Sequence, residues 1–323
     1  MNLNAPVLDP SDVTPGPVVR ARRSAFSLVE LLIVMTLLSL IVLALMDVFS
    51  STQRAFRASV TQTDILEGSR AAMELITSDL RRMSPSQDLS NRLDYPGYPG
   101  FSRYAVNFFV TNNDNNYVYQ PLIQPLTGGG ASRTNLLQWF FILSRDRNKW
   151  IGTGYAVNSA STSDIYPLYR FYGETNVSVD AAVLFNNFVS DVFRGCTNMS
   201  HIMDGVVHLV ARPYDLNGVI MTNGYASGQS PPKNIWFSPP YPPVTGEVGF
   251  AMFNSALPAS VELQMAVLED QAVKRVASRG IPGQPVSPAT ASAQWSYLQS
   301  QSGRVHVFRQ HVTIQNVDRS AYQ

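Results

Sequence analysis

The hydrophobic pattern of the chain begins with one long apolar run. Residues Phe26 to Met46 read FSLVELLIVMTLLSLIVLALM, and Glu30 is the single charged residue among them. At ~1.5 Å per residue, a helix of this length spans roughly 30 Å, the thickness of the hydrocarbon core of a bilayer. No proline or glycine interrupts the run. The pattern therefore predicts a transmembrane helix over 26–46.

The residues on either side of this run predict its orientation. Arg20, Arg22 and Arg23 precede it, and Asp47 follows it. Basic residues near a membrane span stay on the cytoplasmic side. We therefore expect a single pass through the inner membrane, with the N-terminus in the cytoplasm and residues 47–323 outside.

Three simpler interpretations of the run were weighed. A secretory signal peptide has an apolar core of about 7–15 residues and a small-x-small cleavage site, whereas this core is longer and DVFSSTQRAF offers a poor site. A twin-arginine signal would use Arg22 and Arg23, but Ala25 stands where a hydrophobic residue is expected. A plain anchor explains everything except Glu30, because an unpaired carboxylate is costly in lipid.

An amphipathic pattern continues the helix beyond the apolar run. No proline occurs between Asp47 and Ser84, and Pro85 ends the pattern. Apolar residues recur at three- and four-residue steps or multiples of them, while charged residues, Asp79 included, occupy other faces. The stripe consists of Phe56, Val60, Met73, Ile76, Leu80 and Met83. Since coiled-coil heptads are not sustained, we predict one helix from Phe26 to Ser84 whose second half packs on a sheet.

Short apolar runs between turn signals follow residue 100. The strand candidates are Tyr104–Thr111, Leu136–Leu143, Ile165–Tyr172, Val206–Ala211, Val261–Leu268 and Val305–Val317. The helix candidates are Asp180–Phe193, with Val183, Leu184, Phe188 and Val192 on one side, Ala289–Ser300, and a strand passing into helix over Gln264–Ser278. Residues 111–116, 128–130 and 231–246 are loop-like. The expected fold is α+β, with one long N-terminal helix packed on an antiparallel, β-rich globular domain.

The order of residues at the start of the apolar run carries a family resemblance. RRSAFSLVELLIV resembles the type IV prepilin cleavage and methylation motif, in which a basic leader ends in a small residue, Phe follows, and Glu is the fifth mature residue. The resemblance implies that a prepilin peptidase cuts between Ala25 and Phe26 and that the Phe26 amine is then N-methylated. Ala25 stands where the family usually has glycine, and the leader is longer than most.

This resemblance implies a domain organisation and a role for Glu30. Residues 1–25 are the leader, 26–84 the long helix with its transmembrane part at 26–46, and 85–323 the extracytoplasmic domain. In an assembling filament, Glu30 pairs with a Phe26 amine, from a neighbour or from its own chain, and sets axial register. The implied partners are the prepilin peptidase, the major subunit, other minor pilins or pseudopilins, the inner-membrane assembly platform and membrane lipid.

A looser resemblance concerns the remainder of the chain. SRAAMELITSDLRRM resembles the end of the long helix in the pseudopilin J and minor pilin W class, and DGVVHLVARPYDLNG followed by ALPASVELQMAVLED resembles a strand pairing of that class. We interpret the chain as a minor pilin or pseudopilin of a type IV pilus or type II secretion pseudopilus. We place it at the tip, because so large a domain would crowd a helical lattice. A tip adhesin or DNA-uptake module, and a membrane-anchored extracytoplasmic enzyme, remain alternatives.

Composition and candidate chemistry change this picture little. A net charge of +1 gives no electrostatic argument for a nucleic-acid partner. One cysteine, Cys196, excludes an intramolecular disulfide, and we expect it to be buried. The segment Asn112–Asn116 offers a single carboxylate, too few for a calcium site.

Catalytic groupings are missing from the sequence as well. The histidines His201, His208, His306 and His311 form no HExxH arrangement, and no GxSxG elbow or phosphate loop occurs. We therefore predict no enzymatic activity, no cofactor and no metal site. The aromatic residues Trp236, Phe237 and Tyr241 of the proline-rich stretch are expected to pack against the domain.

Overall fold

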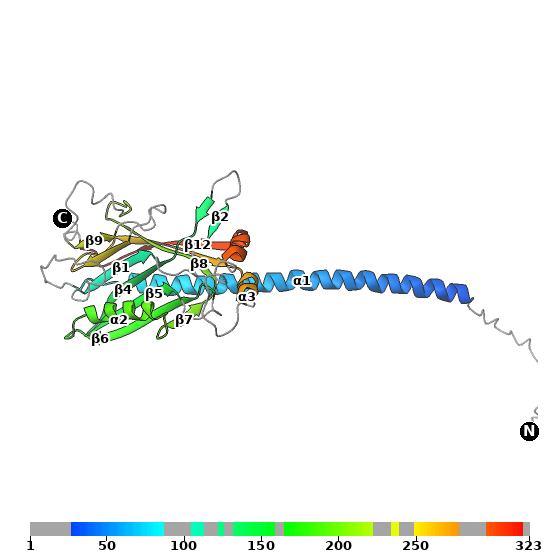
Figure 1. Cartoon of the computed structure of the whole chain (residues 1–323), viewed down its shortest axis with the longest axis horizontal. Coiled ribbons are helices and arrows are strands. Elements are labelled where there is room, and N and C mark those ends of the chain that lie inside the picture. The colour runs from blue at the N-terminus through cyan, green and yellow to red at the C-terminus, as the bar shows by residue number, and fades with distance from the viewer. Residues whose placement is uncertain are drawn as a thin grey trace, which may run out of the picture. The chain divides into compact units, whose positions relative to one another are not determined.

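The computed structural model of the chain describes residues 27–86, 105–112, 122–125, 132–158, 165–221, 234–238, 249–277 and 295–318. It divides into two compact units, Met1–Arg57 and Ala58–Gln323, which are described separately. The helices are α1 (Leu28–Arg81), α2 (Ala182–Phe193) and α3 (Asp270–Ala277), and residues 295–300 are also helical (Figure 1). A short 3-10 helix, η3, covers Ser302–Arg304.

The strands build three antiparallel sheets. They are β1 (Val106–Asn112), β2 (Ile123–Pro125), β3 (Ser132–Thr134), β4 (Gln138–Asp146), β5 (Lys149–Val157), β6 (Leu168–Asn176), β7 (Ser200–Met203), β8 (Val206–Tyr214), β9 (Ile235–Ser238), β10 (Gly249–Phe253), β11 (Ser260–Leu268) and β12 (Val305–Thr313). The largest sheet has the order β7-β6-β5-β4-β1-β10-β9, the second has the order β12-β11-β8, and β2 pairs with β3. The predicted α+β fold is confirmed.

The large sheet is buried on both faces. Along β4, Phe140 and Ile142 point to one face, while Trp139, Phe141 and Leu143 point to the other. The first face belongs to the core that holds α1 and the smaller sheet. The second packs against α2 (Figure 1). This double burial explains why β4 is a continuous apolar run in the sequence rather than an alternating one.

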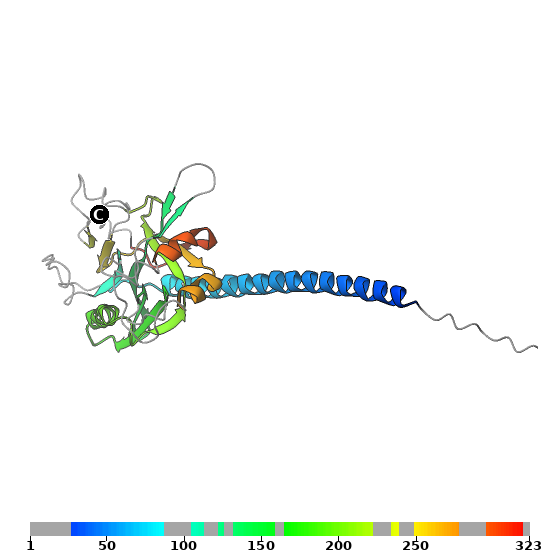
Figure 2. The same ribbon diagram turned by 45° about the vertical axis from the view of Figure 1, so that its right-hand side comes forward.

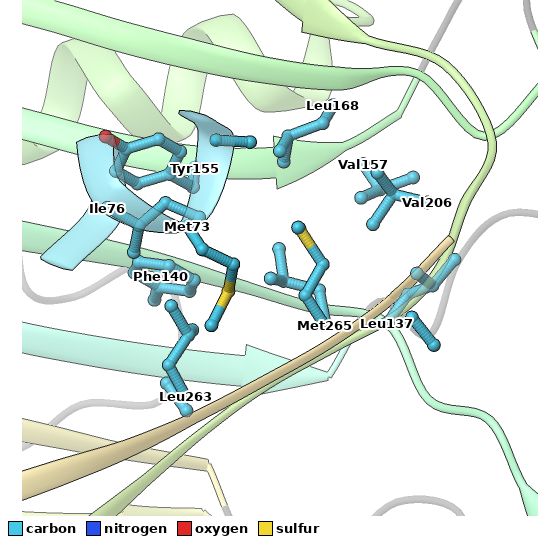
Figure 3. Close-up of a cluster of buried hydrophobic side chains, with 14 of the residues drawn as sticks. Met73, Ile76, Leu137, Phe140, Tyr155, Val157, Leu168, Val206, Leu263 and Met265 are labelled. Atoms are coloured by element: carbon cyan, nitrogen blue, oxygen red, sulfur yellow. The ribbon is translucent and has the colours of Figure 1, made fainter. Parts of the chain in front are cut away.

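The second half of α1 fills the space between the two larger sheets. Met73 and Ile76 lie in one buried cluster with side chains of both sheets, as Figure 3 shows. From the large sheet come Phe140, Tyr155, Val157 and Leu168, and from the smaller sheet and its neighbourhood come Val206, Leu263 and Met265. The helix is therefore part of the core of its unit, since removing it would expose the inner faces of both sheets.

Two glycines of β5 make room for α2. A Cβ atom at Gly154 would lie 2.4 Å from the ring of Phe188, and one at Gly152 would lie 2.9 Å from the ring of Phe141. Side chains at these two positions would force the aromatic rings away from the sheet. The same glycines weaken the strand pattern of KWIGTGYAV, which explains why β5 is missing from the sequence prediction.

Several sequence predictions need correction at their ends. α1 ends at Arg81 rather than Ser84, because Met83 forms a β-bridge with Ser144 and the Ser84 amide donates to the Leu143 carbonyl oxygen at 3.0 Å. β12 ends at Thr313 rather than Val317. The predicted strands are otherwise found as β1, β4, β6, β8, β11 and β12, whereas β5, β7, β9 and β10 and the short hairpin were missed. The proline-rich stretch 231–246, predicted to be a loop, contains β9.

The helix predictions are also refined. The segment Gln264–Ser278 resolves into the end of β11 followed by α3. In α2, Leu184, Phe188 and Val192 are buried as predicted, but Val183 is 45% exposed. The apolar stripe of α1 is buried only in its later part, from Ile65 onward, whereas Phe56 is 70% exposed.

Asp79 was predicted on a face other than the apolar stripe, and the structure adds that this residue is buried. Its carboxylate is buried and accepts a hydrogen bond from the Tyr155 hydroxyl at 2.6 Å. Arg170 donates to both carboxylate oxygens, from Nε at 2.9 Å and from one terminal nitrogen at 3.2 Å. Burial and then the charge of Asp79 raise the pKa of Tyr155, which keeps the hydroxyl protonated as a donor. This network ties α1 to β5 and β6.

Replacing Asp79 with Ala should destabilise the globular unit strongly. The Arg170 guanidinium would lose its counter-charge in a largely buried place, which typically costs about 3–5 kcal/mol. Chemical unfolding of the full chain in detergent measures the change. The exposed pair of Lys149 and Glu174, 50% and 46% exposed, provides the control, since Lys149→Met should cost less than about 1 kcal/mol. Equal effects of the two substitutions would contradict the anchoring role of Asp79.

Candidate functional site

The first turn of α1 is held by a reciprocal pair of hydrogen bonds. The backbone amide of Ser27 donates to Oε2 of Glu30 at 3.0 Å, and the amide of Glu30 donates to the Ser27 hydroxyl oxygen at 3.2 Å. This is a capping box, which satisfies two amides that a helix start otherwise leaves without partners. Its carboxylate also lies at the positive end of the helix dipole. Glu30 is therefore fixed at the extreme N-terminus of the apolar helix.

The side chains that follow Glu30 are apolar and exposed all around the helix. Leu28, Leu43 and Phe49, for example, are 82%, 68% and 64% exposed. The polar residues inside the run do not oppose an apolar environment, because their hydroxyl groups bond within the helix. Thr36 donates to the Ile33 carbonyl oxygen and Ser39 to that of Met35, each at 2.8 Å. Between Leu28 and Met46, Glu30 is the one charged residue.

Among the described residues, α1 is the one helix long and apolar enough to cross a membrane. An apolar surface of this extent is unstable in water and requires lipid or protein contacts. The cleavage and methylation positions, Ala25 and Phe26, lie outside the described residues. The predicted cut between them, and the N-methylation of Phe26, therefore stay predictions. The structure begins next to them, at Ser27.

A comparison with known families identifies this N-terminus. Residues 20–46 match the family model of the prokaryotic N-terminal methylation motif. This match, over the N-terminal segment alone, supports a type IV prepilin-like family. The prepilin motif implies processing by a prepilin peptidase and pilus-type assembly, and together with the apolar helix it is consistent with membrane anchoring. No curated protein and no solved structure matches the prepilin-like chain.

The other candidate residues of the sequence are dispersed in the prepilin-like protein. Cys196 is buried as predicted, and burial, with the nearby Asp191, raises the pKa of its thiol to about 12. His306 and His311 lie on opposite faces of β12, and His201 bonds to Asp204 at 2.9 Å. Of the loop Asn112–Asn116, only Asn112 lies within the described residues, at the end of β1. No group of three metal-ligating side chains occurs within the described ranges.

Trp236 packs against the core beneath α2, in line with the expected packing. The side chain of Phe237, and all of Tyr241, fall outside what the structure describes. His208 is buried in β8, where its Nδ1 accepts a hydrogen bond from the Leu136 amide at 2.9 Å.

The sequence pattern S-x-x-E at Ser27–Glu30 could have revealed the capping box, and it was overlooked. Ser27 is therefore a site residue that the sequence analysis missed. Its hydroxyl positions the first turn from which the Glu30 carboxylate projects.

Substituting Ser27 with Ala should loosen this first turn. Loss of a capping serine costs about 0.5–2 kcal/mol of helix stability. Amide hydrogen exchange of the full chain in detergent should therefore become faster at residues 28–31. Ser39→Ala is the matched control, since that hydroxyl bonds to a carbonyl in the helix interior. Unchanged exchange at the first turn in the Ser27 variant would contradict the capping role.

Proposed function

We propose that the chain is a minor pilin or pseudopilin of the J/W size class, built as a structural subunit into a type IV pilus or type II secretion pseudopilus. The observation that carries the proposal is the match of residues 20–46 to the methylation motif, at the start of a helix whose apolar run, residues 26–46, contains one charged residue, Glu30. In this proposal, residues 47–323 lie outside the cytoplasmic membrane.

The capping geometry gives Glu30 a defined partner after processing. A cut between Ala25 and Phe26 creates an α-amine on the residue next to Ser27, whose own amide already donates to the Glu30 carboxylate. The new amine would thus arise close to Glu30. In an apolar surrounding, a cation and a carboxylate attract each other more strongly than in water. Glu30 can satisfy its own amine or exchange it for the amine of a neighbouring subunit during assembly.

The globular unit supports a structural role. The second half of α1 is buried in the unit, and the Asp79 network fixes it to the large sheet. A force applied to the second half of α1 would therefore act on the whole globular unit, as assembly by a membrane platform would require. We propose that the subunit lies near the tip of the filament, since a sheet domain of this size is hard to repeat along the shaft. We also propose that the chain has no catalytic activity.

Mass spectrometry of the chain from cells with and without prepilin peptidase tests the processing step. The mature protein should begin at an N-methylated Phe26, and only when the peptidase is present. An intact N-terminus in both strains, or a cut beyond Met46, would contradict the proposal.

Replacing Glu30 with Ala separates assembly from anchoring. The variant should reach the membrane and be processed, but its amount in sheared filaments should fall by more than about ten-fold, because an unpaired buried amine costs several kcal/mol. Glu67→Ala, at an exposed position of α1, serves as the control and should assemble normally. Quantitative immunoblots of filament and membrane fractions give the result. Normal incorporation of the Glu30 variant would refute the assembly role.

A further inference from the structure

A groove opens in the globular unit where four segments of the chain meet. It encloses about 430 Å³ and is lined by residues of α1, of β7 and the turn after it, of the end of β11, and of α3. Figures 1 and 2 both show α3, in orange, beside α1. The volume lies within the range of about 300–1,000 Å³ that is typical of binding pockets. The structural role proposed above makes no use of this groove.

The floor of the groove is apolar. Four side chains of the main core line it, namely Ile65 of α1, Val267 and Leu268 of β11, and Val273 of α3. Met203 of β7 lies beside them and is partly buried against the same core. An occupant that places apolar atoms of its own on this floor would remove the remaining apolar surface from water.

The elements around this floor are fixed to one another. The Leu268 amide donates to the Gly205 carbonyl oxygen at 2.8 Å, which joins the turn after β7 to the end of β11. Gly205 has φ +80°, and a Cβ atom there would lie 2.9 Å from the Val273 side chain. The turn therefore requires glycine, both for its backbone conformation and for the close approach of α3. The groove is thus built by contacts within the chain.

Charged side chains line the rim of the groove, and negative charge is in excess there. The described lining residues include three carboxylates, Asp64 of α1, Asp204 after β7 and Asp270 of α3. Lys274 pairs with Asp270, and His201 bonds to Asp204 at 2.9 Å. The hydrogen bond and the charge of Asp270, and further the charge of Asp64, raise the pKa of Lys274, so both carboxylates act on one ammonium. With a neutral imidazole, two negative charges remain uncompensated among the described lining residues.

Gly68 of α1 is a further residue of the lining. A glycine inside a helix is less favourable than alanine. A Cβ atom at Gly68 would meet no atom within 4 Å outside its own stretch of helix, so the described part of the unit does not require glycine here. A bare backbone on the wall of a groove allows a segment of another chain to approach closely.

The chemistry of the groove favours one kind of occupant. An anion would be repelled by the three carboxylates of the rim. A metal ion is a poor match, because no group of three metal-ligating side chains occurs among the described residues. An arginine or lysine side chain suits both parts of the groove, since its stem is apolar and its end is cationic.

We propose that this groove docks a basic segment of a neighbouring filament subunit. An arginine or lysine of that segment places its charge between Asp64, Asp204 and Asp270, and its stem and an adjacent apolar residue pack on the floor at Ile65. The backbone of the segment passes Gly68, where no side chain obstructs it. That the partner is a filament subunit rests on the proposed function, whereas the preference for a basic segment rests on the groove alone.

Fluorescence anisotropy of the full chain in a non-ionic detergent tests the docking. The probe is a labelled short peptide with one arginine next to one leucine, among glycine and serine residues. It should bind saturably, and the binding should weaken as the salt concentration rises, because the contact joins opposite charges. A peptide with glutamine in place of arginine should bind at least about five-fold more weakly.

Three results of this titration would count against the proposal. Failure of the arginine peptide to bind would overturn the docking site. Equal binding of the glutamine peptide would overturn the preference for a basic segment. If free arginine competed as well as the whole peptide, the groove would be a small-molecule site rather than a docking site for a polypeptide.

Variants of α1 make the result specific to the groove. Gly68→Leu fills the open space and should abolish binding without lowering the unfolding temperature, since leucine is the better helix former. Asp64→Asn removes one carboxylate of the rim and should weaken binding several-fold. Glu67→Gln removes a charge at an exposed position outside the lining and should leave binding unchanged. If Gly68→Leu binds like the unaltered chain, the peptide binds elsewhere and the assignment is wrong.

The same variant tests the identity of the partner in cells. Gly68→Leu should reach the membrane and be processed, but its amount in sheared filaments should fall relative to Glu67→Gln. Normal incorporation would show that the partner in the groove is not a filament subunit. Absence of the unaltered chain from filaments would overturn the proposed function and the partner's identity but leave the peptide titration valid, so the two failures are distinguishable.

Discussion

Burial of one face of α1 between two antiparallel sheets is the contact on which the globular unit depends. From Ile65 to Leu80, the helix supplies the side chains that both sheets share as their common core. Neither sheet could be covered without it, since each presents an apolar face to the same helix. The hydrogen bonds of Asp79 to Tyr155 and Arg170 fix the register of the helix on the large sheet, because they form in one register only. The second half of α1 is therefore part of the core of the globular unit.

In contrast to its second half, the first half of α1 is exposed. The apolar side chains of its run 28–46 are exposed, the hydroxyl groups of that run are satisfied by the helix backbone, and the single charge of the run, Glu30, is at the capped end. This distribution suits a helix that moves between lipid and a packed protein environment. In the proposed function, the Glu30 carboxylate pairs with the α-amine that a prepilin peptidase would create at Phe26. The methylation motif and the physical properties of the helix thus point to the same use.

Much of this was predictable from the sequence, and the exceptions share a cause. The long helix, the motif and six strands follow from local patterns, which sequence reasoning can detect. The burial of Asp79 was not predicted because its partners, Tyr155 and Arg170, are 76 and 91 residues away along the chain. β5 was missed because its sequence contains Gly152 and Gly154, which weaken the strand pattern. Both glycines are explained only by the aromatic rings of β4 and α2 that lie against them.

Immunogold labelling of sheared filaments, with an antibody against the exposed turn at Arg147 between β4 and β5, tests the central claim most directly. If the chain is a minor, tip-proximal subunit, gold particles should decorate filament ends and should disappear in cells that lack prepilin peptidase. Label confined to the cell membrane, with filaments bare in peptidase-proficient cells, would contradict the account.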